Sequence, residues 1–173
     1  MRIVQCSHER HAGAILDIFN EAIVNSTALY DYKPRTADSM TGWFKAKRSA
    51  GYPVIGIEDS SGELLGFASY GIFRAWPAYK YCVEHSIYVH FRHRGKGLGK
   101  TLLKEVIDCA RREEYHVLIG GIDVDNAVSI ALHERFGFSH AGTVKHAGFK
   151  FGHWLDLGLY QLILDTPVDP VDG

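Results

Sequence analysis

The stretch from Ser86 to Leu103, SIYVHFRHRGKGLGKTLL, predicts a strand, a glycine-rich turn and the start of a helix. Its apolar beginning, Ile87–Val89, is typical of a buried strand, and Thr101–Leu103 opens a helical pattern. The basic turn between them, residues 92–100, reads RHRGKGLGK. Backbone N–H groups converge at such a turn, and the dipole of the following helix favours negative charge. The stretch therefore predicts a site for phosphate groups.

The length and charge of the chain limit the classes to which it can belong. With 173 residues, 46% of them hydrophobic, it can bury one large core. We expect a single domain over residues 1–164 and a flexible C-terminal tail over 165–173. The net charge of −1 provides no overall field to attract nucleic acid or a membrane surface, so we expect neither as a partner.

The cysteines and the N-terminus favour a cytoplasmic protein. Cys6, Cys82 and Cys109 are odd in number, far apart and without a CxxC spacing, which predicts reduced thiols. Met1–Ser7 lacks the apolar core of a signal peptide, and no run of 18 apolar residues predicts a membrane span. The histidines show no zinc-type spacing, so we expect no metal.

Hydrophobic periodicity predicts a mixed α/β fold of the α+β kind, in which about four helices flank a mixed sheet of about seven strands. The predicted strands cover residues 2–5, 54–58, 64–73, 82–89, 117–122, 139–146 and 154–164. Three predicted helices have N-caps at Ser7, at Asp38 and at Asp125 or Asn126, and the helix after the glycine turn begins at Gly97. An antiparallel meander therefore comes first, and a right-handed β-α-β crossover surrounds the glycine turn.

Two well-known phosphate-binding patterns fit the turn only in part. The P-loop, Gly-x-x-x-x-Gly-Lys-Ser/Thr, agrees at Gly99-Lys100-Thr101, but Arg94 stands at its first glycine. The dinucleotide pattern Gly-x-Gly-x-x-Gly is one residue too long for Gly95, Gly97 and Gly99.

A third pattern, Gln/Arg-x-x-Gly-x-Gly/Ala at a strand-to-helix turn, is matched by residues 92–97, RHRGKG. It is the pyrophosphate-binding motif of the GNAT superfamily of N-acetyltransferases, which this chain resembles. Residues 126–138, NAVSIALHERFGF, are similar to a second segment of that family, with His133 in place of its usual tyrosine.

The resemblance narrows to the phosphinothricin and methionine sulfoximine acetyltransferase branch. It rests on residues 81–103, residues 126–138 and the segment 146–161, HAGFKFGHWLDLGLYQ. The resemblance implies the GNAT fold, acetyl-CoA as cosubstrate and a homodimer. It also implies transfer of acetyl to the α-amine of a small amino acid analogue such as phosphinothricin, methionine sulfoximine or methionine sulfone. The alternatives are another small amine or amino acid as acceptor, or a P-loop-like nucleotide hydrolase.

Strand backbone, the glycine turn and one asparagine are the expected acetyl-CoA site. The resemblance implies that the strand contacts pantetheine, that the turn holds pyrophosphate and that Asn126 binds the pantetheine arm. The expected cofactor-binding residues are Ile87, Tyr88, Val89, Arg92, Gly95, Lys96, Gly97, Leu98, Gly99, Lys100 and Asn126.

Glu84 and His133 are the expected catalytic residues. Glu84 shares one strand face with Cys82 and Ser86, and a carboxylate there can take a proton if partial burial raises its pKa. His133 lies between apolar neighbours, which is usual for a core histidine, but it stands where the family has a tyrosine that protonates the thiolate. Imidazole can perform either proton transfer, so which residue is the base and which the acid stays open.

The acceptor site is expected around the loop after the third strand and on the catalytic strand. Arg74 can pair with a carboxylate or phosphinate through two parallel hydrogen bonds. The branch pattern Arg-Pro-Phe is only partly kept here as Arg74-Ala75-Trp76. The expected substrate-binding residues are Tyr30, Arg74, Ala75, Trp76, Tyr79, Glu84, His85 and Ser86.

Overall fold

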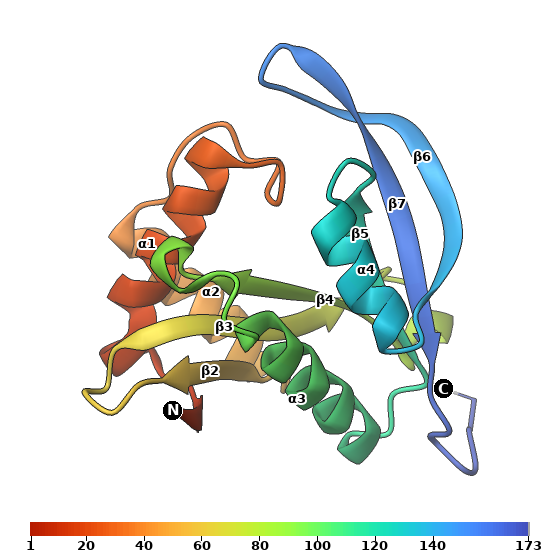
Figure 1. The fold of residues 1–173 in the computed structure, drawn as a ribbon. Helices are drawn as coiled ribbons and strands as arrows, with labels where there is room; N and C mark the ends of the chain where they lie inside the picture. Colours follow the sequence, from red (N-terminus) through yellow and green to blue (C-terminus); the bar gives the residue numbers. More distant parts are fainter. Residues whose placement is uncertain (173) are drawn as a thin grey trace. The chain divides into compact units, whose positions relative to one another are not determined.

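The computed structural model describes residues 1–172, which form one seven-stranded mixed sheet and four α-helices (Figure 1). The strands occur in the spatial order β1-β2-β3-β4-β5-β7-β6. This architecture confirms the predicted fold class. The strands are β1 (Arg2–Gln5), β2 (Val54–Glu58), β3 (Leu64–Ile72), β4 (Cys82–Val89), β5 (Val117–Asp123), β6 (Ser139–Lys150) and β7 (His153–Ile163).

The four α-helices lie close to their predicted positions, and two short 3-10 helices flank β4. The helices are α1 (His8–Asn25), α2 (Ala37–Ser49), η1 (Pro77–Tyr79), η2 (Phe91–His93), α3 (Leu98–Arg112) and α4 (Ala127–Arg135). The predicted N-cap of the second helix, Asp38, is wrong by two residues. Thr36 has the extended backbone of an N-cap, and Asp38 lies in the first turn, where its charge favours the helix dipole.

The residues group into two compact units. The first contains residues 1–69 and 87–103, and the second contains 70–86 and 104 onward. Strands β3 and β4 and helix α3 each pass from one unit into the other. No observation tests the expectation of a single domain over 1–164, which stays a prediction.

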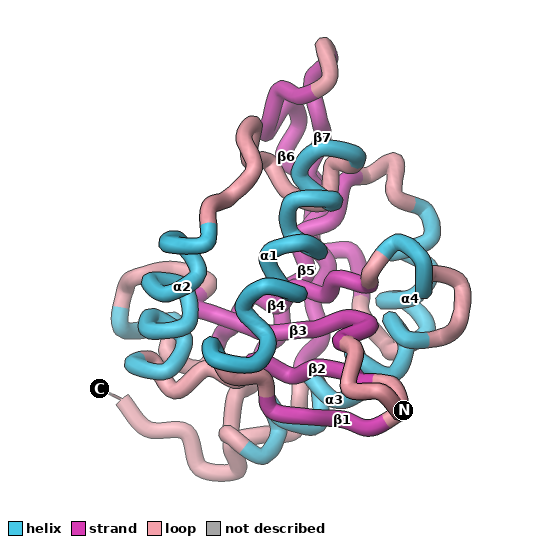
Figure 2. Tube along the Cα trace, turned by 90° about the vertical axis from the view of Figure 1, so that its left-hand side faces the viewer, coloured by secondary structure: helices cyan, strands magenta, loops and turns pink. Residues whose placement is uncertain are grey.

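Aromatic side chains from α1, α2 and the sheet form the core of the first unit, in which β1, β2 and β3 are neighbours (Figure 2). The Phe19 ring packs edge-on against Trp43, Phe67 and Tyr88, with ring centroids 5.0–5.5 Å apart. On the other face of β3, a Cβ at Gly66 would lie 2.8 Å from the Tyr88 carbonyl oxygen. The glycine thus lets β4 approach β3 closely near the end of β4.

A buried carboxylate, Glu58, fastens β1 and α1 to the end of β2. It accepts hydrogen bonds from Arg2 at 2.6 and 2.8 Å, from Arg10 at 3.1 Å and from His11 at 2.8 Å. The bonds from His11 and Arg2 lower the pKa of Glu58 below its usual value. Because Ser7 N–H donates to Nδ1 of His11, Nε2 of this ring carries the proton that bonds Glu58.

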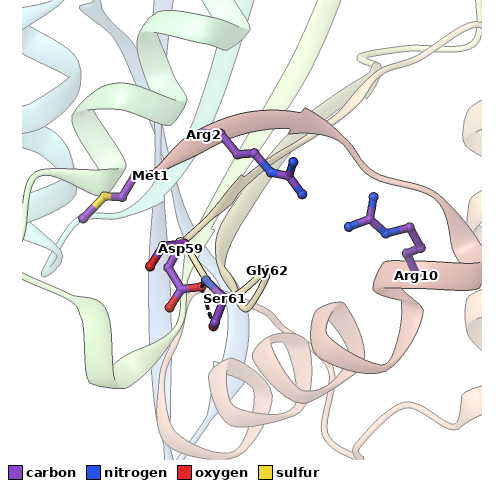
Figure 3. Close-up of a pocket in the computed structure, with 7 residues that line it drawn as sticks. Met1, Arg2, Arg10, Asp59, Ser61 and Gly62 are labelled. Atoms are coloured by element: carbon purple, nitrogen blue, oxygen red, sulfur yellow. Dashed lines mark hydrogen bonds between the residues drawn. The ribbon is translucent and has the colours of Figure 1, made fainter.

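Beside this carboxylate, a pocket of about 350 Å³ is lined by the guanidinium groups of Arg2 and Arg10 and by the 59–62 turn (Figure 3). Both guanidinium groups already pair with Glu58. We therefore assign Arg2 and Arg10 a structural role in the first unit and not a ligand-binding one.

In the second unit, β5 pairs in parallel with β4 from Cys82 to His85 and antiparallel with β7. The β6–β7 hairpin is longer than predicted and extends past α4 (Figure 1). The predicted end of the sixth strand at His146 is wrong. A register shift between Val144 and Gly148 lets β6 continue to Lys150 beyond a left-handed residue, His146, with φ of 53°.

The C-terminal segment makes hydrogen bonds within the second unit. His116 bonds the Thr166 carbonyl at 2.8 Å, and the Tyr81 hydroxyl bonds both the N–H and the carbonyl of Val171 at 3.1 and 3.3 Å. Thr166 and Val171 thus have defined partners, whereas Gly173 lies outside the described residues. Flexibility of this tail stays a prediction.

Candidate active site

The glycine turn joins η2 to α3 in the first unit and has the backbone of a phosphate-binding loop. Gly95 and Gly97 have φ of 75° and 80°, a left-handed conformation that side-chain-bearing residues seldom adopt. Helix α3 begins at Leu98, and its first helical hydrogen bond runs from Thr101 N–H to the Gly97 carbonyl. The N–H groups of residues 98–100 therefore project from the helix N-terminus, where they favour an anion.

The expected residues of this turn contribute in different ways. The side chains of Arg92, Lys96 and Lys100 are exposed, as a phosphate site requires. Leu98 is only 4% exposed, so only its backbone N–H is available to a ligand. The half-buried residues Ile87–Val89 lie beyond the β4–β5 ladder, which ends at His85.

Arg94 has a role in the turn that the sequence reasoning missed. Its guanidinium pairs with the Glu21 carboxylate of α1, and its Nε donates to the Val89 carbonyl at 3.3 Å. Arg94, which departs from the P-loop pattern, thus connects the turn to α1 and to the end of β4. Arg94 is one of several basic residues in this turn, and nothing in the sequence indicates which of them pairs with a carboxylate elsewhere in the chain.

Glu84 is half-buried in the second unit, on the face of β4 predicted for it. Burial raises the pKa of Glu84 above the usual range, and the positive charge of Arg74 partly offsets this effect. The carboxylate lies against the main chain of β5, where a Cβ at Gly121 would be 3.0 Å from Oε1 of Glu84. The raised pKa makes the Glu84 carboxylate a better proton acceptor than an ordinary glutamate.

The loop after β3 brings a cation and aromatic rings to the same unit. The Arg74 guanidinium lies 4.3 Å from the centroid of the Phe73 ring and donates to the Phe73 carbonyl at 2.9 Å. The Trp76 and Tyr79 rings have centroids 6.5 Å apart and are 68% and 43% exposed. Ala75 is also exposed, and Ser86 is half-buried. Tyr30 belongs to the first unit, so its expected place in the substrate site stays a prediction.

His85 and His133 form a buried pair on the opposite face of β4 from Glu84. Their Nε2 atoms are 2.9 Å apart, and Nδ1 of His133 lies 2.7 Å from the Ser129 carbonyl oxygen. A carbonyl only accepts hydrogen bonds, so Nδ1 of His133 carries the proton of that ring, and its Nε2 accepts a hydrogen bond from Nε2–H of His85. In the neutral His85 ring, Nδ1 is then the unprotonated nitrogen.

Both histidines are held neutral. Burial, together with His133, lowers the pKa of His85 to about 3, and burial also lowers the pKa of His133. The side chains are 6% and 5% exposed. This geometry does not favour the expected contact of His85 with substrate, nor direct exchange of a proton between His133 and a ligand. No sequence pattern predicts this pair, because its members are 48 residues apart.

Asn126 is the N-cap of α4, since its side-chain oxygen accepts a hydrogen bond from Ser129 N–H at 3.1 Å. The residue is exposed, so the capping role leaves it accessible. In residues 1–172, no three His, Cys, Asp or Glu side chains gather in a way that could hold a metal ion. No described helix has the length and apolar character needed to cross a membrane.

Comparison with known proteins identifies the class of this fold and site. The model of the acetyltransferase (GNAT) family matches residues 15–138. An L-methionine sulfoximine/L-methionine sulfone acetyltransferase from Pseudomonas aeruginosa is 44% identical over 151 residues, which are 87% of this chain and 88% of the relative. A phosphinothricin N-acetyltransferase from Streptomyces coelicolor is 32% identical over 149 residues, which are 85% and 87% of the two chains.

A solved structure extends the likeness to nearly the whole chain. An acetyltransferase from Salmonella typhimurium, solved with its cofactor acetyl-CoA, has a TM-score of 0.93 and 40% identity over 99% of this chain and 98% of its own. This chain belongs to the acetyltransferase (GNAT) family. The predicted family and enzyme class are thus confirmed, and the nucleotide-hydrolase alternative loses its support.

Proposed function

We propose that this protein transfers the acetyl group of acetyl-CoA to the α-amine of a small amino acid analogue. Methionine sulfoximine and methionine sulfone are the first choices because the more similar of the two curated relatives is named for them. Phosphinothricin is the second choice because the relative named for it is less similar. The observation that carries the proposal is the half-buried Glu84 carboxylate, whose pKa is raised, close to the charge of Arg74.

Glu84 and Arg74 together complement an amino acid head group. An α-amino acid presents a positive ammonium and a negative carboxylate a few ångströms apart. Arg74 attracts the carboxylate, and Glu84 takes a proton from the ammonium, directly or through water. The amine that results is a nucleophile, whereas the ammonium is not. Exposed Trp76 and Tyr79 are available to contact the side chain of the acceptor.

The glycine turn fits the pyrophosphate of acetyl-CoA. Two left-handed glycines and the N-terminus of α3 provide backbone donors, and Arg92, Lys96 and Lys100 provide positive charge. The cosubstrate supplies the acetyl thioester when bound. We further propose that the backbone of Ile87–Val89 and the exposed Asn126 hold its pantetheine arm.

We retain His133 as the proposed source of the proton for the leaving thiolate, with a condition. Its position corresponds to the tyrosine that has this role in the wider family. Nδ1 of His133 carries its proton and donates to the Ser129 carbonyl, while Nε2 accepts from His85, so the bond to Ser129 must open before His133 can give up a proton to a ligand. Glu84 can take up a proton without first breaking such a hydrogen bond, so we assign the role of the base to Glu84.

We also propose a homodimer and a cytoplasmic location. Exposed apolar side chains on the β6–β7 hairpin, among them Phe149, Phe151 and Trp154, are suited to contact a second copy. The three cysteines are free, as the reducing cytoplasm requires, and burial raises the pKa of Cys6 to about 12. Analytical ultracentrifugation at micromolar concentration tests the dimer, and cell fractionation tests the location.

Ligand-dependent melting distinguishes the acetyltransferase site from a nucleotide site. At a hundredfold excess over its dissociation constant, a ligand adds about 2.7 kcal/mol to the free energy of unfolding. We therefore expect CoA or acetyl-CoA to raise the melting temperature by about 5 °C or more, and ATP with Mg²⁺ to have no such effect. A rise with ATP-Mg²⁺ alone would contradict the proposed cosubstrate.

A thiol-release assay over a panel of amines tests the acceptor. The panel should contain methionine sulfoximine, methionine sulfone, phosphinothricin, ordinary amino acids and a short peptide, each at the same concentration of acetyl-CoA. We expect kcat/KM to be highest for the two methionine derivatives and lower for phosphinothricin. A higher kcat/KM for the peptide would contradict the assignment to small amino acids.

A further inference from the structure

Strand β5, which pairs with the strand that contains Glu84, has two adjacent glycines. Gly120 and Gly121 face opposite sides of the sheet. On one side, a Cβ at Gly120 would lie 3.1 Å from Cε1 of His85 and 3.4 Å from the ring of His133. On the other side, a Cβ at Gly121 would lie 3.0 Å from Oε1 of Glu84 and 3.4 Å from a methyl carbon of Leu157. Each glycine therefore leaves room for a different group.

Gly121 is unusual because it is exposed although its strand is internal. Strand β5 has β4 on one side and β7 on the other, and Gly121 pairs with Leu159. Glycine inside a strand weakens it, because it has no side chain to pack and gains more backbone freedom on unfolding. Its φ is not among the positive values of this chain, so the backbone conformation does not demand glycine. What glycine provides at 121 is the space that the Glu84 carboxylate occupies.

We infer that Gly121 is a positioning residue for Glu84. The absence of a side chain at 121 determines where the Glu84 carboxylate lies and how much water reaches it. This inference rests on the role proposed above for Glu84 as the base. A methyl group at 121 would stand closer to Oε1 than the usual contact distance of about 3.5 Å, so the carboxylate would move. It would also remove water from the carboxylate and raise the pKa of Glu84 further.

The kinetic test uses Gly121→Ala. The Glu84 carboxylate is at the end of a flexible side chain, so it can move away from the added methyl group without unfolding of the protein. We expect kcat to fall by about 10-fold or more, and the acidic limb of the pH profile of kcat/KM to move to higher pH. The KM for acetyl-CoA should stay within about twofold, because the glycine turn is untouched. Gly13→Ala is the control, since a Cβ at this exposed α1 position meets nothing within 4 Å, and it should retain the wild-type kcat.

A shorter base should relieve the conflict. Glu84→Asp withdraws the carboxylate by one methylene group and will itself slow the enzyme. In the Gly121→Ala background, however, Glu84→Asp should cost much less than it does alone, because the clash is already avoided. If the two effects multiply independently, or if Gly121→Ala has the wild-type kcat and pH profile, the positioning role is wrong.

A stability cycle tests the same contact without chemistry. We expect any loss of melting temperature in Gly121→Ala to be recovered when Glu84→Ala removes the carboxylate. The loss caused by Gly120→Ala, on the same strand but facing the histidine pair, should not be recovered. If the cost of Gly121→Ala persists without the carboxylate, the contact with Glu84 does not explain the glycine. Should Glu84→Gln prove fully active, the base role fails, but this cycle still decides the contact.

Discussion

Glu84→Gln should lower kcat by about 100-fold or more while leaving the affinity for acetyl-CoA nearly unchanged. Glutamine has the size and shape of glutamate but cannot take a proton from the acceptor ammonium. The glycine turn that we propose for the pyrophosphate is formed by other residues, so ground-state binding of the cosubstrate should persist. Single-turnover kinetics and a CoA melting series on the variant measure the two effects separately.

The pH profile gives the same experiment a second readout. Because burial raises the pKa of Glu84, the wild-type kcat/KM should rise with pH through a limb above the ordinary range of a glutamate. That limb should be missing from the residual activity of Glu84→Gln. Glu134→Gln, the same change at an exposed position on α4, is the control and should retain both the wild-type kcat and the limb.

Loss of the carboxylate should not cost stability. An acid whose folded pKa is raised binds protons more tightly in the folded state than in the unfolded chain. Its ionised form therefore destabilises the fold at neutral pH. We expect Glu84→Gln to melt at the wild-type temperature or above, as is common for residues kept for activity. An inactive variant that also melts far lower would indicate a structural role for Glu84, and full activity would remove Glu84 from the mechanism.

The sequence predicted those parts of the molecule that depend on local patterns. Strand and helix periodicity gave the element order, and the glycines of the turn stand where the backbone is left-handed, at Gly95 and Gly97. Glu84 could be assigned to a strand face because side chains alternate along a strand. The family resemblance supplied the enzyme class, which neither composition nor spacing could have supplied.

Most of the missed features depend on contacts between segments that are separated in the sequence. Gly121 matters because of Glu84, and the neutral state of His85 depends on its burial and on His133, 48 residues away. The extension of β6 to Lys150 depends on a bulge that lets an irregular, mostly exposed strand stay paired with β7. An exposed strand shows no alternation of apolar and polar residues, so its length cannot be predicted from hydrophobicity.

The buried histidine pair should make the protein sensitive to acid, and this prediction concerns stability rather than catalysis. In the unfolded chain a histidine takes up a proton near its ordinary pKa of 6.5, whereas burial and the neighbouring histidine lower the pKa of folded His85 to about 3. Between these values the unfolded state binds the additional proton. The free energy of unfolding should therefore fall with decreasing pH, by up to about 1.4 kcal/mol per pH unit for this group.

His85→Phe should remove this dependence while destabilising the protein at high pH. Phenylalanine keeps a ring in the space beside Gly120 but leaves Nε2 of His133 without its donor, which should cost about 1–3 kcal/mol at pH 8. Between pH 6 and pH 4, however, the variant should lose less stability than the wild type, so the two curves approach each other. Urea unfolding followed by circular dichroism at several pH values measures the slope.

Phe138→Leu is the matched control, because Phe138 packs against both histidine rings, with centroids 5.3 and 5.1 Å away, but does not titrate. It should lower the free energy of unfolding by about 1 kcal/mol at every pH and so run parallel to the wild type. If His85→Phe also runs parallel to the wild type, the pair does not bind fewer protons in the folded state. A slope lost only in His85→Phe would instead show that a buried neutral imidazole, held between a carbonyl and a second ring, limits stability in acid.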